Sequence, residues 1–288
     1  MSTSATAVPA AHHATAQTAS TAALDALLES AAADGTVIVT FSNFKYLPIL
    51  ENWRVAMGRL GIDKLLVVAL DQPTYDHLRG QGVPCHLSPC ADDLSALWPR
   101  RVALFRHILR RGYNLIHSDV DAVWLKDPRA EHFLGSDADI VFSQATQWPT
   151  DCYAHWRFTL CCGLFFLRAT DAVQDFMGQW VEHVADTRDD QVSFNQLLLA
   201  QSITWDIAEP YSVPTPFGVD ITCSRRTIRG QAGALKVDVL PQHLFQRVHF
   251  PGEDAYVKHC LSGQTAETTR EGLAQAGCWL LSDASPGR

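Results

Sequence analysis

Short apolar runs separated by helix-length segments most constrain the fold of this chain. Thr36–Phe41 and Leu65–Leu70 are unbroken runs of apolar or β-branched residues, and a strand-like segment recurs at Tyr113–Ser118. Such runs suit strands buried on both faces of a sheet that helices cover. The sequence therefore predicts an α/β fold with a mixed, mostly parallel sheet flanked by helices.

The remaining elements continue this alternation of strand and helix. Helices are expected at 48–60, 73–79 and 99–111, with a short strand near 84–87, so that Tyr113–Ser118 becomes the fourth strand. Later in the chain we expect strands at 139–143, 161–167, 235–240 and 255–257, and helices at 170–186, from Asp189, and at 265–276. The segment 209–233, rich in Pro, Gly and Arg, is interpreted as a loop.

Length and composition indicate one globular unit. With 288 residues, 47% of them hydrophobic, the chain is predicted to form a single domain over 36–281, after a disordered or partly helical segment at 1–35 and before a tail at 282–288. The net charge of −8, without a basic run, argues against a nucleic-acid partner. No apolar stretch approaches the roughly 18 residues of a membrane span, so no transmembrane segment or anchor is expected, and no secretory signal is recognisable. Of the eight cysteines, Cys85 and Cys90 flank a turn and are compatible with a disulfide in an oxidising compartment, but isolated buried thiols are the favoured interpretation.

An acidic pair follows the fourth strand. Asp119 and Asp121 are one residue apart, so on an extended backbone their side chains point the same way. Two carboxylates at the carboxyl end of a buried strand suit Mg²⁺ or Mn²⁺, and ligands of α/β sheets bind at this edge. A second pair, Asp137 and Asp139, shows that this spacing also arises by chance. The pair alone leaves a solvated turn and a metal site equally open.

Several motifs together resemble a known family. In order along the chain they are Val39–Asn43, Val67–Asp71, Ser118–Pro128, Asp190–Asn195, His259 and Gly277–Trp279. Their order and spacing are similar to those of nucleotide-diphospho-sugar transferases, in particular the group around glycosyltransferase family 77. The resemblance implies a GT-A (Rossmann-like) fold, a nucleotide-sugar donor such as a UDP-sugar, a Mn²⁺ or Mg²⁺ cofactor, and retaining transfer to a glycan or glycoprotein acceptor. It also implies the Golgi lumen, although the sequence shows no anchor.

The same resemblance assigns roles to individual residues. Asp121, as part of a DxD motif, and His259 would ligate the metal. Asp119 would contact the donor, and Asp190 would face the anomeric carbon or the acceptor hydroxyl, so both are catalytic candidates. Asp189 remains an alternative to Asp190, and an acidic residue at a helix N-terminus is the structural alternative for either.

Further residues are expected to bind the donor nucleotide. They are Thr40, Ser42, Asn43, Asp71, Arg101 and Arg270. The alternative for Thr40, Ser42 and Asn43 is that they are ordinary polar residues at a strand end. The alternative for Arg101 is that it belongs to a solvated basic face of its helix. Arg101 would reach the diphosphate of the donor. Arg270 would replace a lysine that the family usually carries before the terminal Gly-x-Trp and that would hold the same diphosphate. His117 has no assigned role.

Two other functions are compatible with parts of the sequence. An apolar strand followed by Asp-Val-Asp also fits a haloacid-dehalogenase-like phosphatase, although such enzymes place this motif on the first strand. A catalytically inactive domain that binds nucleotide or glycan is the second alternative. The aromatic loop from Trp148 to Phe158 is interpreted either as a stacking surface for a sugar ring or as part of the core.

Overall fold

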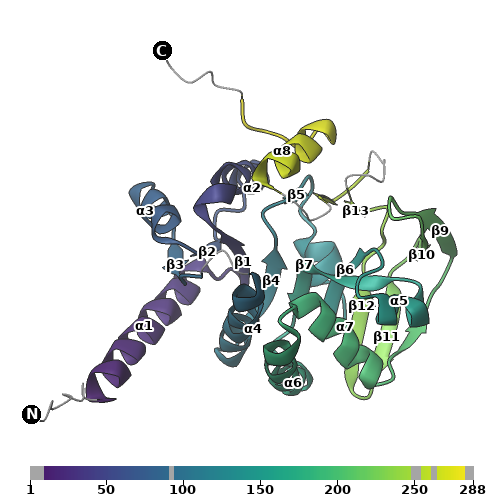
Figure 1. Ribbon diagram of the computed structural model, residues 1–288, viewed down its shortest axis with the longest axis horizontal. Helices are drawn as coiled ribbons and strands as arrows, with labels where there is room; N and C mark the ends of the chain where they lie inside the picture. The colour runs from purple at the N-terminus through teal and green to yellow at the C-terminus, as the bar shows by residue number, and fades with distance from the viewer. Residues whose placement is uncertain (1–9, 91–93, 248–253, 261–264, 283–288) are drawn as a thin grey trace, which may run out of the picture.

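A central sheet with helices on both faces forms the body of the protein (Figure 1). The structure is a computed structural model that describes residues 10–90, 94–247, 254–260 and 265–282. Within these residues the sheet has nine strands in the order β3-β2-β1-β4-β7-β6-β12-β11-β8. Their bounds are β1 Thr36–Ser42, β2 Leu66–Ala69, β3 Cys85–Leu87, β4 Asn114–Ser118, β6 Ile140–Ala145, β7 Thr159–Leu167, β8 Thr204–Asp206, β11 Ile228–Ala232 and β12 Leu235–Val239.

Most strands of this sheet run in the same direction. Strands β3, β2, β1 and β4 pair in parallel, whereas β7 runs antiparallel to both of its neighbours and β11 runs antiparallel to β12 and β8. The chain changes direction across the sheet between β1 and β4, which is the switch point where α/β sheets bind ligands. The predicted mixed, mostly parallel sheet and the place of Asp119 after the fourth strand are both confirmed.

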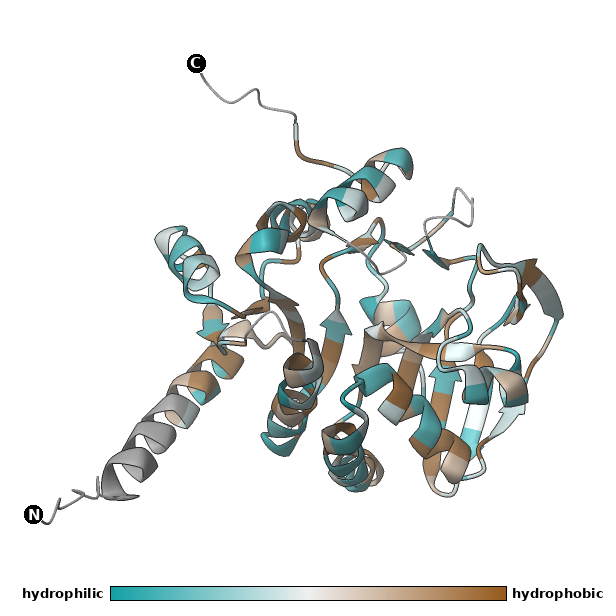
Figure 2. Ribbon diagram, in the orientation of Figure 1, coloured by the Kyte–Doolittle hydropathy of each residue, from teal (hydrophilic) through white to brown (hydrophobic). Residues whose placement is uncertain are grey.

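Alternate side chains of the strands enter two separate cores. Val37 and Val39 of β1 belong to one apolar cluster, and Ile38 belongs to the other. The first core is covered by α1 (Ala10–Ala31), α4 (Leu94–Arg110), α5 (Thr150–Trp156), α6 (Asp171–Thr187) and α7 (Asp190–Ala200). The second is covered by α2 (Leu47–Arg59), α3 (Gln72–Gly80) and α8 (Ala266–Gln275), together with the short helical turn η2 (Arg129–Phe133). Accordingly the strands are mostly brown in Figure 2, while the helices carry teal, hydrophilic surface.

Two small sheets complete the fold. Strands β9 (Pro210–Pro214) and β10 (Asp220–Ser224) form an antiparallel hairpin, and β13 (Phe245–Arg247), β14 (Val257–His259) and β5 (Ala122–Trp124) form a three-stranded sheet. In the second of these sheets β5 begins directly after Asp121. Because β14 pairs with β5, a segment near the end of the chain lies beside the acidic pair.

Some sequence-based expectations were wrong. The segment 209–233 holds β9, β10 and β11 instead of a loop. Antiparallel strands that are buried on one face alternate in burial, and β9 begins and ends on Pro, which strand ends tolerate. The aromatic loop contains α5, and α4 begins before Pro99, which lies inside that helix. Cys85 is a free, buried thiol, which agrees with the expectation of isolated thiols and not with the alternative of a disulfide to Cys90.

The N-terminal segment is helical over Ala10–Ala31, whereas residues 1–9 and 283–288 lie outside the described residues. The division at 36–281 stays a prediction. Among the described helices, none combines the length and the apolar character that crossing a bilayer requires.

Candidate active site

The chain turns sharply at the carboxyl end of β4. Ser118, the last residue of the strand, is buried, and its Oγ accepts hydrogen bonds from the indole Nε1 atoms of Trp53 and Trp124, each at 3.2 Å. The backbone N–H of Ala122 then donates to the carbonyl oxygen of Asp119 at 3.1 Å, which closes the turn into β5. Asp119 and Asp121 therefore lie on a turn whose first residue, Ser118, is fixed by hydrogen bonds from two buried indoles.

His259 completes a cluster with these two carboxylates. In the three-stranded sheet His259 lies opposite Ala122, the residue after Asp121. Its Nε2 is 3.4 Å from Oδ1 of Asp121 and 3.9 Å from Oδ2 of Asp119, and one ligand atom from each of the three residues lies within 4.8 Å of the others. Burial and Arg247 lower the pKa of His259, but Asp121 and Cys161 outweigh them and raise this pKa to about 9. The site thus favours positive charge.

Gly163 leaves open the space between these side chains. It lies on β7, where its carbonyl oxygen accepts a hydrogen bond from the backbone N–H of Asp119 at 2.7 Å. A Cβ at this position would lie 2.5 Å from Oδ2 of Asp119 and 2.3 Å from Cε1 of His259. Two carboxylates and an imidazole around such a space form a donor set that fits Mn²⁺ or Mg²⁺.

Arg101 joins Asp119 to the other catalytic candidate, Asp190. This buried arginine comes from α4, and its Nε donates to Oδ2 of Asp190 at 2.7 Å. Its Nη2 donates to the same oxygen and, at 3.3 Å, to the carbonyl oxygen of Cys162, while Nη1 donates to Oδ1 of Asp119 at 3.0 Å. The Trp98 ring covers the guanidinium at 4.4 Å. These bonds orient both carboxylates, whereas the predicted contact of Arg101 with the diphosphate stays a prediction.

Burial affects the two carboxylates differently. Asp190 is almost fully buried, and this burial raises its pKa to about 6 against the opposing effect of Arg101. The side chain of Asp119 is 36% exposed. Burial opposes ionisation there too, but Arg101 and His117 hold the pKa of Asp119 well below its usual range. Asp119 is therefore an anion at every physiological pH.

His117, which had no role assigned from the sequence, contacts the Arg101–Asp119 pair. It is fully buried, and its Nδ1 lies 3.1 Å from the carbonyl oxygen of Val39. Its Nε2 lies 3.2 Å from Nη1 of Arg101 and 3.0 Å from Oδ1 of Asp119, so the ring contacts both members of this ion pair. Burial and the positive charge of Arg101 lower the pKa of His117 and keep it neutral. His117 thus helps to fix the side of Arg101 that holds Asp119.

Sequence reasoning missed two residues of the site, Arg247 and Cys161. Arg247 lies opposite His259 in the parallel pairing of β13 with β14. It is buried, and its Nη2 donates to Sγ of Cys161 at 2.9 Å while Nη1 donates to the carbonyl oxygen of Cys260 at 2.8 Å. Burial raises the pKa of the Cys161 thiol, but the charges of Arg247 and His259 reverse this and lower it to about 7. Arg247 reaches the site through the pairing of two short strands, and no local sequence motif predicts this.

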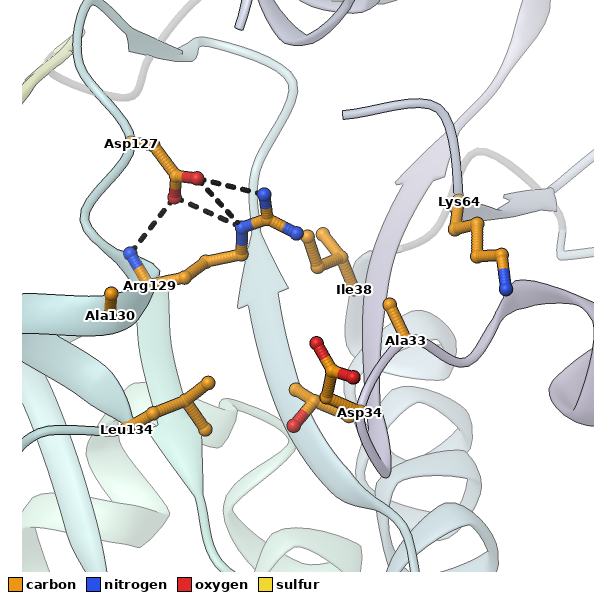
Figure 3. Close-up of a pocket in the computed structure, with 9 residues that line it drawn as sticks. Ala33, Asp34, Ile38, Lys64, Asp127, Arg129, Ala130 and Leu134 are labelled. Carbon is orange, nitrogen blue, oxygen red and sulfur yellow. Dashed lines mark hydrogen bonds and ion pairs between the residues drawn. The ribbon is translucent and has the colours of Figure 1, made fainter. Parts of the chain in front are cut away.

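Most of these side chains line one cavity of about 170 Å³, although Asp121 and His117 are not part of its lining. It is lined by Trp98, Arg101, Asp119, Trp148, Cys161, Cys162, Gly163, Asp189, Asp190, Gln191, Arg247 and His259. A cavity of about 190 Å³ lies at the opposite end of β1, beside Thr36, between Lys64 and the Asp127–Arg129 ion pair (Figure 3). That second cavity has no cluster of metal-ligating side chains among the described residues, so the first is the better candidate for chemistry.

The remaining predicted donor-binding residues lie outside this cavity's lining. Asp71 and Asn43 cap helical turns: Asp71 accepts from the N–H groups of Thr74 and Phe44, both at 2.9 Å, and Asn43 accepts from Tyr46. Burial opposes ionisation of Asp71, but these bonds lower its pKa. Thr40 and Ser42 are buried at the end of β1, and Arg270 is exposed on α8, where it stacks on Trp279. Their roles in donor binding stay predictions.

Comparison with known proteins fits this geometry. Residues 60–264 match the model of a family described as nucleotide-diphospho-sugar transferase. The chain belongs to this family. The haloacid-dehalogenase-like alternative loses its support, since the acidic pair follows the fourth strand and lies within the matched range.

Relatives of this family member include two plant enzymes from Arabidopsis thaliana. A UDP-D-xylose:L-fucose alpha-1,3-D-xylosyltransferase is 30% identical over 196 residues, which cover 58% of this chain and 54% of the relative. Arabinosyltransferase XEG113 is 26% identical over 234 residues, covering 75% of this chain and 34% of that protein. The chain thus spans about half of the first relative and a third of the second.

Solved structures also align with the chain. The glycosyltransferase GlyE of Streptococcus pneumoniae aligns with a TM-score of 0.45 and 10% identity, over 87% of this chain and 66% of that one. Mouse xyloside xylosyltransferase 1 aligns with a TM-score of 0.38 and 14% identity, over 57% of this chain and 82% of that one.

Proposed function

We propose that this chain is a metal-dependent glycosyltransferase that moves a sugar from a UDP-sugar to a hydroxyl group of a glycan or glycoprotein, with retention of configuration. One observation carries the proposal: Asp119, Asp121 and His259 converge beside a buried arginine, Arg247, at the switch point of the sheet. Carboxylates with an imidazole suit a divalent cation, and an arginine suits phosphate oxygens.

Asp121 and His259 would hold the cation, with Asp119 beside them. When bound, the cation supplies positive charge that stabilises the departing diphosphate. The residues themselves favour this arrangement, because the turn after β4 positions both aspartates and Arg101 holds Asp119 before any ligand arrives. Gly163 provides the space for it.

Arg247 is the best candidate for contact with the diphosphate. Its Nε has no hydrogen-bond partner among the described residues, and no carboxylate of these residues pairs with its charge. A buried guanidinium in this state is costly unless an anion joins it. The diphosphate would supply that anion, so Arg247 would take the role that the family resemblance assigned to Arg270.

Asp190 would act on the sugar. It borders the same cavity, and Arg101 fixes its carboxylate. A fixed carboxylate favours the positive charge that develops at an anomeric carbon when its bond to the leaving group breaks. Because Arg101 donates hydrogen bonds to both Asp119 and Asp190, it would also keep these two carboxylates in a fixed relative position.

The test is release of UDP from UDP-D-xylose, UDP-L-arabinose and UDP-galactose, with Mn²⁺ or with EDTA. The names of the relatives direct the first two choices. We expect Mn²⁺-dependent release from at least one donor, and a product whose anomeric NMR signals show retention. UDP binding without turnover would instead support the inactive binding domain, and an inverted product would overturn the stereochemical part alone.

A further inference from the structure

The aromatic loop resolves into one exposed ring and three buried ones. Tyr153, Trp156 and Phe158 pack into the cores, whereas Trp148 is 52% exposed. Trp148 is also the member of this group that lines the cavity of the candidate active site. An exposed indole on the rim of a cavity offers an apolar face to a ligand that enters the cavity, with a polar N–H at its edge.

Two hydrogen bonds hold Trp148 to the start of α7. Its Nε1 donates to Oδ2 of Asp189 at 3.4 Å, and its carbonyl oxygen accepts from Nε2 of Gln191 at 2.8 Å. Asp189 is itself fixed, because its Oδ1 caps the helix by accepting from the N–H of Val192 at 2.9 Å. The ring therefore stands in a defined place, and little conformational freedom is lost when a ligand covers it.

The side chains that line the cavity are linked by a series of contacts. His259 and Arg247 lie at the proposed metal and diphosphate end, followed by Asp119 and then by Arg101, which reaches Asp190. Trp148 contacts Asp189 and Gln191, the two chain neighbours of Asp190. A group held by Trp148 would thus lie at the Asp190 end of this series of contacts.

We propose that Trp148, with Asp189 and Gln191, forms the acceptor subsite and takes a single sugar ring by stacking; this rests on the proposed function. A sugar ring has an apolar face of C–H groups and a polar rim of hydroxyls. The indole suits the face, and the carboxylate and amide beside it suit the rim. This position makes the acceptor hydroxyl a neighbour of Asp190, where the transferred sugar must arrive.

The experiment measures transfer to three probes: methyl α-L-fucopyranoside, methyl β-D-galactopyranoside and methyl β-L-arabinofuranoside. Trp148→Ala is expected to raise the KM for the accepted glycoside about tenfold, more than it changes the KM for the UDP-sugar, and Trp148→Phe to raise it less. Leu134→Ala, which truncates an exposed apolar residue at the other cavity, should leave both values unchanged. An unchanged KM for the glycoside in Trp148→Ala overturns the subsite.

A binding measurement separates this proposal from the proposed function. Saturation-transfer NMR detects each glycoside in contact with the protein in the presence of UDP and Mn²⁺, without any turnover. Signal in the wild type that Trp148→Ala removes supports the subsite even if no UDP-sugar is cleaved, in which case only the proposed function fails. No signal from any of the three glycosides with the wild type overturns the subsite.

Discussion

Oδ1 of Asp121 lies 3.4 Å from Nε2 of His259, although one residue is near the middle of the chain and the other near its end. The antiparallel pairing of β14 with β5 produces this proximity, since it sets His259 opposite Ala122. The cluster is therefore a product of the backbone ladder and not of a flexible loop. Side chains on such a ladder are placed accurately enough to bind an ion.

Gly163→Ala should impair the site and leave the fold intact. The new methyl group would collide with Asp119 and His259, and displacing them by about 1 Å costs on the order of a hundredfold in rate. We expect this loss in Mn²⁺-dependent UDP release, with a still cooperative unfolding transition and a stability loss of about 1–3 kcal/mol from overpacking. Gly178→Ala, where a Cβ meets nothing within 4 Å, is the control. Wild-type activity in Gly163→Ala would show that the space beside Gly163 is not used.

Loss of Arg101 should destabilise the protein. Arg101→Met leaves Asp190 buried without its partner, and breaking a buried pair costs about 3–5 kcal/mol. Urea unfolding measures this, and Arg101→Met combined with Asp190→Leu should recover part of the loss. Arg226→Met removes an exposed ion pair with Glu209 and should cost at most about 1 kcal/mol. Equal stabilities of the two single variants would contradict the pairing described here.

Cys161 should react with iodoacetamide at lower pH than the neighbouring Cys162. The charges of Arg247 and His259 lower the pKa of Cys161 to about 7, while burial raises that of Cys162. Because the thiolate is the nucleophile, labelling of Cys161 should rise as the pH passes about 7. Peptide mass spectrometry distinguishes the two sites, and UDP with Mn²⁺ should protect Cys161. Faster labelling of Cys162 would refute the proposed electrostatics.

Besides Arg101, two arginines are candidates for contact with the diphosphate, Arg247 and Arg270. Arg247→Ala should weaken UDP binding in Mn²⁺ by about tenfold to a hundredfold, the range expected for a charged hydrogen bond. Calorimetry on Arg247→Ala and Arg270→Ala decides between the two residues, and Arg247→Lys shows whether charge alone suffices. A larger loss in Arg270→Ala would restore the assignment drawn from the family resemblance.

The sequence predicted what depends on local pattern. The unbroken runs in β1, β2 and β4 and the polar residues after them followed from periodicity, and the acidic pair was placed on the correct strand end. Arg247 could not be found, because it reaches the site only through the pairing of β13 with β14. The strands β9 and β10 were missed because their alternating, partly exposed residues resemble a loop when their partner is unknown.

The most direct test of the account is Mn²⁺ affinity, measured by electron paramagnetic resonance in the presence of UDP, for the wild type, Asp121→Asn and His259→Ala. Asp121→Asn preserves size and removes one charge. We predict that the wild type binds one Mn²⁺ and that both variants bind it at least about tenfold more weakly, with UDP release lost in parallel. Equal Mn²⁺ affinity in all three proteins would contradict the account.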